Sequence, residues 1–265
     1  MVWSFGFVLL LILPLAALYV RAPFRMVRIV ECCLLVREAM SLSLSTSLTA
    51  TALTFVFGTP VAYTLARVSF RGRRLVEALI ELPLTLPPVV AGVALLLVFG
   101  RRGLVGQHLA VLGIELSFTR TAVVMAQFMV ASPYYIKAAT GAFAMVPESL
   151  LRASRTLGAG PFHTFRRVVL PLCRNGLLAG LAMTWSRAIG EFGATIMFAG
   201  NLPGRTQTMP LAILTTMNQN LHAGVVLSVA MLTVCLLVFV VARHLLQPAL
   251  DPLNRAGRES PEERR

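Results

Sequence analysis

Long apolar runs, separated by short polar segments, dominate the pattern of the chain. A helix that crosses the hydrocarbon core of a bilayer needs roughly 20 predominantly apolar residues. Six runs approach or exceed that length, and they cover residues 2–20, 41–66, 82–99, 121–139, 177–199 and 223–242. None shows the alternation of a membrane β-strand, so helices are the expected spanning elements. The sequence therefore predicts an all-α, polytopic membrane helical bundle with about six transmembrane helices.

Composition agrees with a membrane environment. The residues are 57% hydrophobic and 13% charged, whereas a soluble domain carries about 25% charged residues. The formal net charge is +13, and Lys137 is the only lysine. A basic balance can indicate nucleic-acid binding. Here the charges lie between the apolar runs, so cytoplasmic loops and lipid head groups explain them better, and no nucleic-acid partner is expected.

The distribution of basic residues predicts the orientation of the bundle. With the N-terminus inside, the cytoplasmic connections and tail hold fifteen Lys and Arg residues, against eight on the other side. Basic residues favour cytoplasmic loops, so both termini are predicted to be cytoplasmic. The main exception is the segment 21–37, which we interpret as an interfacial helix. The first run lacks a preceding basic region, which favours a spanning helix over a cleaved signal.

The connection between the fourth and fifth runs, residues 140–175, has the pattern of a structured loop. Pro147 can open a helix, with Glu148 in its first turn at the positive end of the helix dipole. The sequence Gly158-Ala159-Gly160-Pro161 predicts a break, and a second short helix is expected over 161–169, closed by Leu170-Pro171. These residues predict a cytoplasmic projection with apolar side chains available to a partner. An amphipathic loop lying on the membrane is an equal alternative on physical grounds alone.

This loop resembles the "EAA" loop of ABC-importer permeases, whose pattern is E-A-A-x3-G-x9-I-x-L-P. Ala153-Ser154 and Gly158 are followed, after nine residues, by Val168-x-Leu170-Pro171. Arg152 stands where the family has glutamate. The resemblance implies a type I ABC importer permease fold whose coupling helix, within about 147–171, sits in a cleft of an ATPase subunit. The residues it assigns to coupling are Arg152, Ala153, Ser154, Gly158, Ala159, Gly160, Val168, Leu170 and Pro171.

Further stretches look like molybdate-type permeases, and they lie at 81–90, 99–103, 152–160, 187–195, 198–201, 203–204 and 206–210. Sulfate permeases share the Gly-Glu-Phe/Tyr-Gly motif but usually follow it with Ser-Val-Val, whereas Ala194-Thr195 follows it here. The resemblance implies a homodimer in a bacterial or archaeal cytoplasmic membrane. We expect residues 1–250 to form the transmembrane permease domain, followed by a flexible cytoplasmic tail over 251–265, where the sequence is polar and of mixed charge. The resemblance also implies two ABC ATPase subunits that hold ATP and magnesium, and an extracytoplasmic oxyanion-binding protein. Molybdate is the implied substrate, with tungstate as a co-substrate.

Two ionisable residues, Arg187 and Glu191, lie four positions apart inside the fifth apolar run and are predicted to share one helix face. Charges inside a membrane are costly and mark function by default. They either line the substrate path or form a structural ion pair. Gly190 and Gly193 flank Glu191 and would allow close helix approach, and Thr195 could offer a hydroxyl to an anion.

The outer segment after this run resembles a gate or a docking site for the binding protein, and its candidate residues are Asn201, Gly204 and Thr206.

The sequence carries no motif for chemistry of its own. It lacks the G-x-x-x-x-G-K-[ST] phosphate-binding loop, H-E-x-x-H and a nucleophile elbow. We therefore expect a chain that is not an enzyme and that binds no cofactor or metal. Three alternatives remain open: a sulfate or thiosulfate permease, a stand-alone channel or secondary transporter, and, least favoured, a membrane-embedded enzyme.

Overall fold

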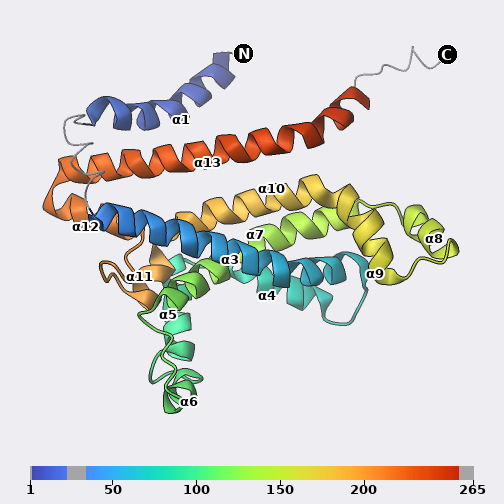
Figure 1. The fold of residues 1–265 in the computed structure, drawn as a ribbon, viewed down its shortest axis with the longest axis horizontal. Helices are drawn as coiled ribbons and strands as arrows, with labels where there is room; N and C mark the ends of the chain where they lie inside the picture. The colour runs from blue at the N-terminus through green and yellow to red at the C-terminus, as the bar shows by residue number, and fades with distance from the viewer. Residues whose placement is uncertain (1, 23–33, 257–265) are drawn as a thin grey trace. The chain divides into compact units, whose positions relative to one another are not determined.

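The computed structural model describes residues 2–22 and 34–256, with side chains described over 5–22 and 36–241. Every regular element within these ranges is helical (Figure 1), which confirms the all-α class. The elements are α1 (Val2–Arg21), α3 (Leu34–Arg67), α4 (Arg73–Thr85), α5 (Pro88–Phe99), α6 (Gly106–Val111), α7 (Arg120–Ala144), α8 (Glu148–Thr156), α9 (Pro161–Thr164), the π-helical segment η1 (Phe165–Val169), α10 (Leu170–Ile189), α11 (Gly193–Ala199), α12 (Met209–Gln219) and α13 (Leu221–Ala256).

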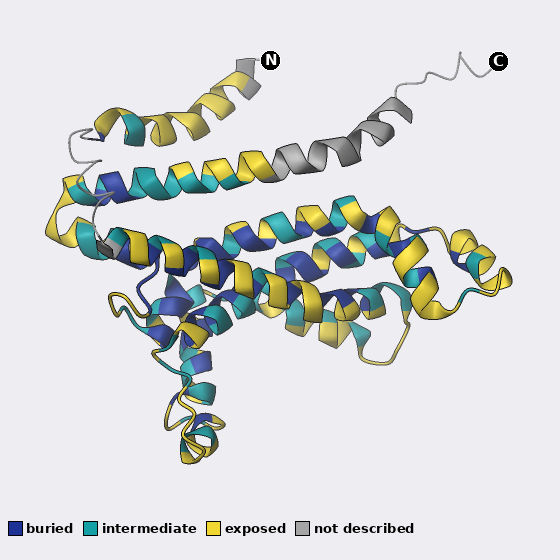
Figure 2. Cartoon of the chain, in the orientation of Figure 1, coloured by how far each residue is buried: buried dark blue, intermediate teal, exposed yellow. Residues whose placement is uncertain are grey.

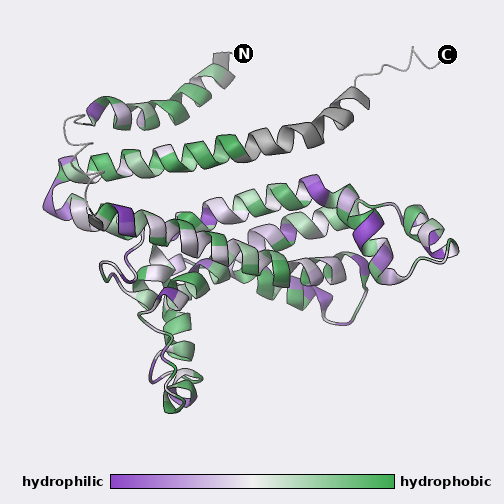
Figure 3. Cartoon of the chain, viewed as in Figure 1, coloured by the Kyte–Doolittle hydropathy of each residue, from purple (hydrophilic) through white to green (hydrophobic). Residues whose placement is uncertain are grey.

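Each predicted apolar run contains a helix, but the spans differ in quality. Within the described residues three helical stretches are long and apolar enough to cross a membrane, namely Val36–Arg67, Pro161–Ile189 and Leu221–Val241, and α4 with α5 forms a fourth if counted as one broken span. The described apolar part of α1 is shorter, and α7, which is 25 residues long, is not among these spans. Figure 3 shows the strongly apolar character of α13 over its described side chains.

Two predicted runs are interrupted. The third run is divided between α4 and α5, because Pro87 and Pro88 cannot supply the amide hydrogens that a continuous helix needs there. The fifth run is divided between α10, which ends at Ile189, and α11, which begins at Gly193. The expectation that Arg187 and Glu191 share one helix face is therefore wrong, because Glu191 lies in the break between the two helices.

The chain divides into two compact units. The described parts of Met1–Thr46, Pro88–Ala126 and Ile189–Leu237 form the first unit, and those of Ser47–Pro87, Gln127–Ala188 and Val238–Arg265 form the second. The interfacial helix predicted within 21–37 falls largely on residues 23–33, outside the described residues. The predicted flexible tail is helical to Ala256, and its remainder, 257–265, lies outside them as well.

The core of the second unit joins α3, α7 and α10. Tyr135 of α7 is fully buried, and its hydroxyl hydrogen-bonds Thr59 Oγ1 of α3 at 2.6 Å. On α10, a Cβ at Gly176 would lie 2.6 Å from Ala142 Cβ, and one at Gly180 would lie 2.9 Å from Ala138 Cβ. These glycines therefore let α10 approach α7 more closely than any larger residue would allow.

In the first unit, α5 packs against the short helix α11. A Cβ at Gly92 would lie 2.7 Å from the Ala194 carbonyl oxygen, and one at Gly193 would lie 3.0 Å from Pro88 Cβ and from Val89 N. Both helices thus present a glycine to the other, which brings their backbones together. The close helix approach predicted for Gly193 is confirmed, with α5 as the partner helix.

Candidate functional site

The connection between α7 and α10, residues 147–171, is structured, as its sequence predicts. Pro147 precedes the first helical residue of α8, and Glu148 lies in the first turn. At the other end of α8, the Gly158 amide donates to the Arg155 carbonyl (2.9 Å), and the Ala159 amide donates to the Ser154 carbonyl (3.1 Å). This pair of hydrogen bonds is the Schellman motif, which ends helices at a residue in the left-handed conformation.

Two glycines shape the turn between α8 and α9 in different ways. Gly158 has φ of +80°, a conformation that costs other residues about 1–2 kcal/mol. Gly160 has φ of −67°, which any residue adopts. A Cβ at either position would meet no heavy atom within 4 Å. Glycine is therefore needed at position 158 because of its backbone conformation and not because of space. Position 160 has neither need for a glycine.

Side chains tie α8 to α9 and fix both to the ends of the longer helices. The Ser154 and Thr164 hydroxyls hydrogen-bond each other at 2.9 Å. Leu151 is buried in the core of the second unit. The ring of Phe165 lies 5.1 Å from that of Tyr63 in α3 and 6.1 Å from that of Phe143 in α7, measured between centroids. The loop is thus held as a small folded element.

The outer surface of this loop is apolar and basic. Leu157 is 87% exposed and Phe162 73% exposed, and Arg155, Arg166 and Arg167 are exposed as well. Figure 2 shows this exposure over α8 and α9. Exposed large apolar side chains rimmed by polar ones are typical of a surface that binds another protein or a membrane.

Arg67, at the end of α3, holds the base of the loop. Its Nη2 donates to the carbonyl oxygens of Phe143 (2.6 Å) and Val146 (2.7 Å), and its Nη1 lies 3.7 Å from Glu148 Oε2. The last carbonyls of a helix lack partners within the helix, and here the guanidinium supplies one where α7 ends. Sequence analysis treated Arg67 only as a cytoplasmic loop charge, and its contacts with residues more than 70 positions away leave no local signal.

Arg152 occupies the position at which the family pattern has glutamate. Its Nε lies 3.9 Å from Glu148 Oε1, and the Arg152 side chain is 77% exposed. Such an exposed i, i+4 pair contributes little to stability. The carboxylate near this surface is therefore that of Glu148, one helical turn before the family position.

The predicted end of the loop is wrong. Leu170 and Pro171 were expected to close the second short helix, but α10 begins at Leu170 and continues directly from α9 through η1, so that helix runs from Pro161 to Ile189. The Leu170 amide donates to the Phe165 carbonyl across the π-helical segment. Pro171 has no amide hydrogen to donate, and it lies in the first turn of α10, directly after the π-helical segment. Val168 lies in this segment and is half-buried.

The path candidates do not form one helical face. Arg187 lies in the last turn of α10 and is half-buried, and Gly190 is exposed in the turn that follows. Glu191 is 1% exposed, and its Oε1 accepts a hydrogen bond of 2.8 Å from the Ala194 amide. That amide belongs to the first turn of α11, where a carboxylate is favoured by the helix dipole. Glu191 therefore stabilises the first turn of α11 by accepting this hydrogen bond, a role that the sequence did not predict.

Thr195 is fully buried in α11, beside the contact with α5. Among the described residues its Oγ1 has no hydrogen-bond partner. A role for Thr195 and the other path candidates in binding an anion stays a prediction.

The three outer candidates have different surroundings. The side-chain Nδ2 of Asn201 donates a hydrogen bond to Thr215 Oγ1 at 2.9 Å. Thr206 is fully buried, and its Oγ1 accepts from the Leu202 amide at 3.1 Å, which holds the loop. Gly204 is exposed with φ of +71°. Of the three, Gly204 is exposed, Asn201 is half-buried and Thr206 is buried.

Comparison with known proteins identifies related sequences. The family described as "binding-protein-dependent transport system inner membrane component" matches residues 55–255. The probable transport system permease protein NifC of Clostridium pasteurianum is 42% identical over 185 residues, covering 69% of this chain and 65% of NifC, so the chain spans slightly less than two thirds of that relative. The molybdenum transport system permease protein ModB of Mycobacterium tuberculosis is 41% identical over 202 residues, 76% of each chain. The probable sulfate transport system permease protein cysT of Nephroselmis olivacea is 35% identical over 187 residues, covering 71% of this chain and 66% of cysT.

Solved structures share the fold. A chain of a bacterial ABC transporter that imports the acidic polysaccharide alginate matches with a TM-score of 0.74 at 14% identity, covering 94% of this chain and 93% of that one. A chain of the MetNI methionine ABC transporter in an inward-facing conformation matches with a TM-score of 0.59 at 21% identity, covering 84% and 95%. The type I importer permease fold predicted from the sequence is confirmed. The chain therefore belongs to the family of binding-protein-dependent transport system inner membrane components, the membrane permeases of ABC importers.

Proposed function

We propose that this chain is the membrane-spanning permease subunit of an ATP-driven importer for molybdate, with tungstate as a co-substrate. The observation that carries the proposal is the 41% identity with a molybdenum transport permease over 76% of the chain. The folded 147–171 loop supports the mechanism. ATP and magnesium would bind to separate ATPase subunits, and this chain would supply the path through the cytoplasmic membrane.

The geometry of the loop suits the transmission of movement. Its exposed apolar side chains, Leu157 and Phe162, would enter a cleft of an ATPase subunit. Its inner contacts reach three helices, through Arg67 on α3, the carbonyls at the end of α7, and the direct continuation into α10. A displacement of the loop would therefore move the ends of these helices together, because packed interfaces switch between discrete arrangements rather than deform freely.

The assembly in this proposal is a homodimer with two ATPase subunits, served by an extracytoplasmic binding protein that delivers the oxyanion. Both termini would lie in the cytoplasm. Arg187, Gly190, Glu191, Gly193 and Thr195 are the candidate path residues, and the permease would bind the anion weakly, because tight binding would stall its release.

Uptake of labelled molybdate by vesicles that contain the permease, its ATPase and its binding protein tests the proposal directly. Uptake should require ATP, and excess sulfate should not abolish it. The match with cysT favours sulfate as the second candidate substrate. Sulfate uptake without molybdate uptake would establish that alternative, and ATP-independent flux through the permease alone would indicate a channel or a secondary transporter.

Glu191 offers a way to separate a path role from a structural role. Glu191→Gln keeps an oxygen that can accept the Ala194 amide and removes only the charge, whereas Glu191→Ala removes both. If the charge serves transport, the glutamine variant should fold with unchanged thermal stability and lose uptake. Normal uptake by Glu191→Gln, with a destabilised Glu191→Ala, would leave Glu191 as the residue that starts α11.

A further inference from the structure

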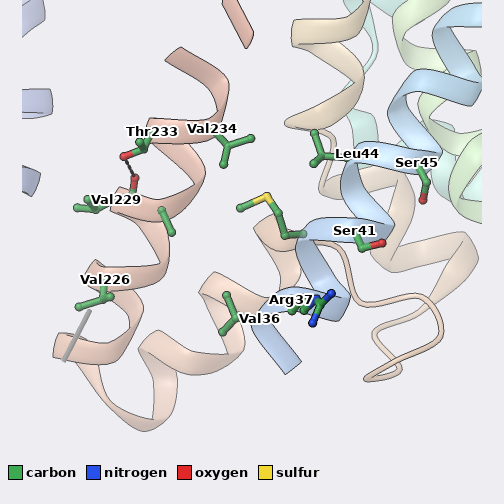
Figure 4. Close-up of a pocket in the computed structure, with 11 residues that line it drawn as sticks. Val36, Arg37, Ser41, Leu44, Ser45, Val226, Val229, Thr233 and Val234 are labelled. Carbon is green, nitrogen blue, oxygen red and sulfur yellow. Dashed lines mark hydrogen bonds between the residues drawn. The ribbon is translucent and has the colours of Figure 1, made fainter. Parts of the chain in front are cut away.

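A groove between α3 and α13 lies outside the features that the proposed transport function uses. It has a volume of about 720 Å³, and all the residues that line it belong to the first unit. Figure 4 shows Val36 and Arg37 of α3 at the level of Val226 of α13 at one end, and Leu44 facing Val234 at the other. Ligand pockets in proteins are typically about 300–1,000 Å³, so the groove has the capacity to hold a ligand.

The walls of this groove are mainly apolar, and two of the three hydroxyl side chains that line it are satisfied within their own helices, whereas the third, Ser41, is exposed one helical turn from Arg37. Ser45 Oγ donates to the Leu42 carbonyl at 3.1 Å, and Thr233 Oγ1 donates to the Val229 carbonyl at 2.8 Å. Serine and threonine in membrane helices commonly satisfy their hydroxyls in this way. Hydrocarbon is therefore the chemistry that fits the interior of the groove.

One end of the groove carries a positive charge. Among the described residues that line the groove, Arg37 is the only charged one, and its side chain is exposed. Within the part of the chain that the structure describes, it forms no ion pair. A guanidinium group binds phosphate with paired, charge-assisted hydrogen bonds.

The length of the groove matches one leaflet of a bilayer. Arg37 lies in the first turns of the spanning stretch Val36–Arg67, which places it near the boundary of the membrane. Ser45 lies eight residues further along α3, about 12 Å at the helical rise of 1.5 Å per residue. Half of the roughly 30 Å hydrocarbon core is about 15 Å. The groove thus combines a cation at one end with apolar walls that extend to nearly the depth of one leaflet.

We infer that this groove binds an anionic phospholipid, with its phosphate on Arg37 and one acyl chain between α3 and α13. A protein segment from a second copy would also cover apolar walls, but it would need an acidic group at the level of Arg37. A phospholipid brings the phosphate and the hydrocarbon in one molecule and is present wherever the chain is embedded.

Native mass spectrometry of the intact detergent-solubilised transporter, titrated with phosphatidylglycerol or phosphatidylcholine of identical acyl chains, tests the inference. The wild type should retain phosphatidylglycerol better, because phosphatidylcholine has the same phosphate but offsets its charge with the choline cation. Arg37→Gln should lower phosphatidylglycerol retention at least about tenfold, as expected for the loss of a hydrogen bond to a charged group, and should lower phosphatidylcholine retention less. Arg205→Gln is the matched control, because Arg205 is exposed in the same unit and does not line the groove.

A second pair of variants tests the place of the acyl chain. Ala230→Phe fills the groove and should reduce retention of both lipids, whereas Val240→Phe, an exposed position of α13 outside the groove, should not. Equal phosphatidylglycerol retention by the wild type and Arg37→Gln would overturn the inference. Two other results would overturn it as well. One is an equal loss of phosphatidylglycerol retention in Arg37→Gln and Arg205→Gln, and the other is an Ala230→Phe variant that disrupts the dimer but still retains both lipids.

Discussion

Replacing Gly158 with alanine would isolate the energetic role of one backbone conformation in the 147–171 loop. Gly158 has φ of +80°, and an added Cβ would meet no heavy atom within 4 Å. The cost of the substitution is therefore conformational and not steric, and it amounts to about 1–2 kcal/mol. A penalty of this size changes the ratio of closed to open turn by a factor of about 5–30.

Amide hydrogen exchange of the turn measures this ratio. The amides of Gly158 and Ala159 are held by the carbonyls of Arg155 and Ser154, so opening of the turn exposes both. In Gly158→Ala the amides of residues 158 and 159 should exchange about 5–30 times faster than in the wild type. Gly160→Ala is the matched control, because Gly160 has equally open surroundings and an ordinary φ of −67°, and it should leave the exchange rates nearly unchanged.

Two results would refute this reasoning. Equal exchange in the alanine variants at positions 158 and 160 would mean that the left-handed conformation does not limit the turn. Gly158→Asn should lie between glycine and alanine, because asparagine tolerates the left-handed region, and a protection no better than that of alanine would point to another cause. If the turn also sets coupling, the more strained Gly158→Val should hydrolyse ATP in the assembled transporter without uptake, while it still inserts into the membrane. Normal uptake and normal co-purification with the ATPase would show that the loop does not couple.

Two further substitutions test contacts that hold the units together internally. Arg67→Met removes two hydrogen bonds from a charged donor and should lower the unfolding free energy of the detergent-solubilised protein by at least about 1.5 kcal/mol. Arg71→Met, at an exposed position four residues later, should not lower it. Equal melting temperatures of the two variants would contradict the role given to Arg67. Gly92→Ala places a Cβ within 3 Å of the α11 backbone and should lower the unfolding free energy of the protein by about 1–3 kcal/mol. Gly141→Ala, in open surroundings within α7, should raise the unfolding free energy by about 0.5–1 kcal/mol. A Gly92→Ala variant at least as stable as the wild type would show that α5 and α11 can separate without cost.

The sequence was sufficient where a feature depends on neighbouring residues. Apolar runs located the helices, because the length needed to cross a bilayer is the same everywhere in the chain. The turn at Gly158 followed from a glycine between two amphipathic segments. Its hydrogen bonds involve residues 154–159 alone, so local sequence contains all the information they need.

Features that depend on distant residues were missed or misplaced. Arg67 contacts the Phe143 carbonyl 76 residues away, and nothing near it in the sequence distinguishes it from the other arginines of the cytoplasmic loops. The break after Ile189 has a similar origin. The segment 177–199 is apolar enough to continue as one helix, but α11 packs its backbone against α5 through Gly92 and Gly193. Tertiary packing, which no periodicity reports, thus decides where Glu191 lies.

The structure also separates two reasons for a glycine in this fold, and the distinction bears on how movement could pass through the chain. Gly92, Gly176, Gly180 and Gly193 remove steric bulk, so that helices pack closely within each unit. Gly158 removes no bulk, since its surroundings are open, and instead permits a sharp turn between α8 and α9. A loop held by a sharp turn, a side-chain hydrogen bond and buried anchors can move as one piece, and closely packed helices can follow it. Weakening the turn should therefore impair coupling before it impairs folding, whereas filling a helix contact should impair both together.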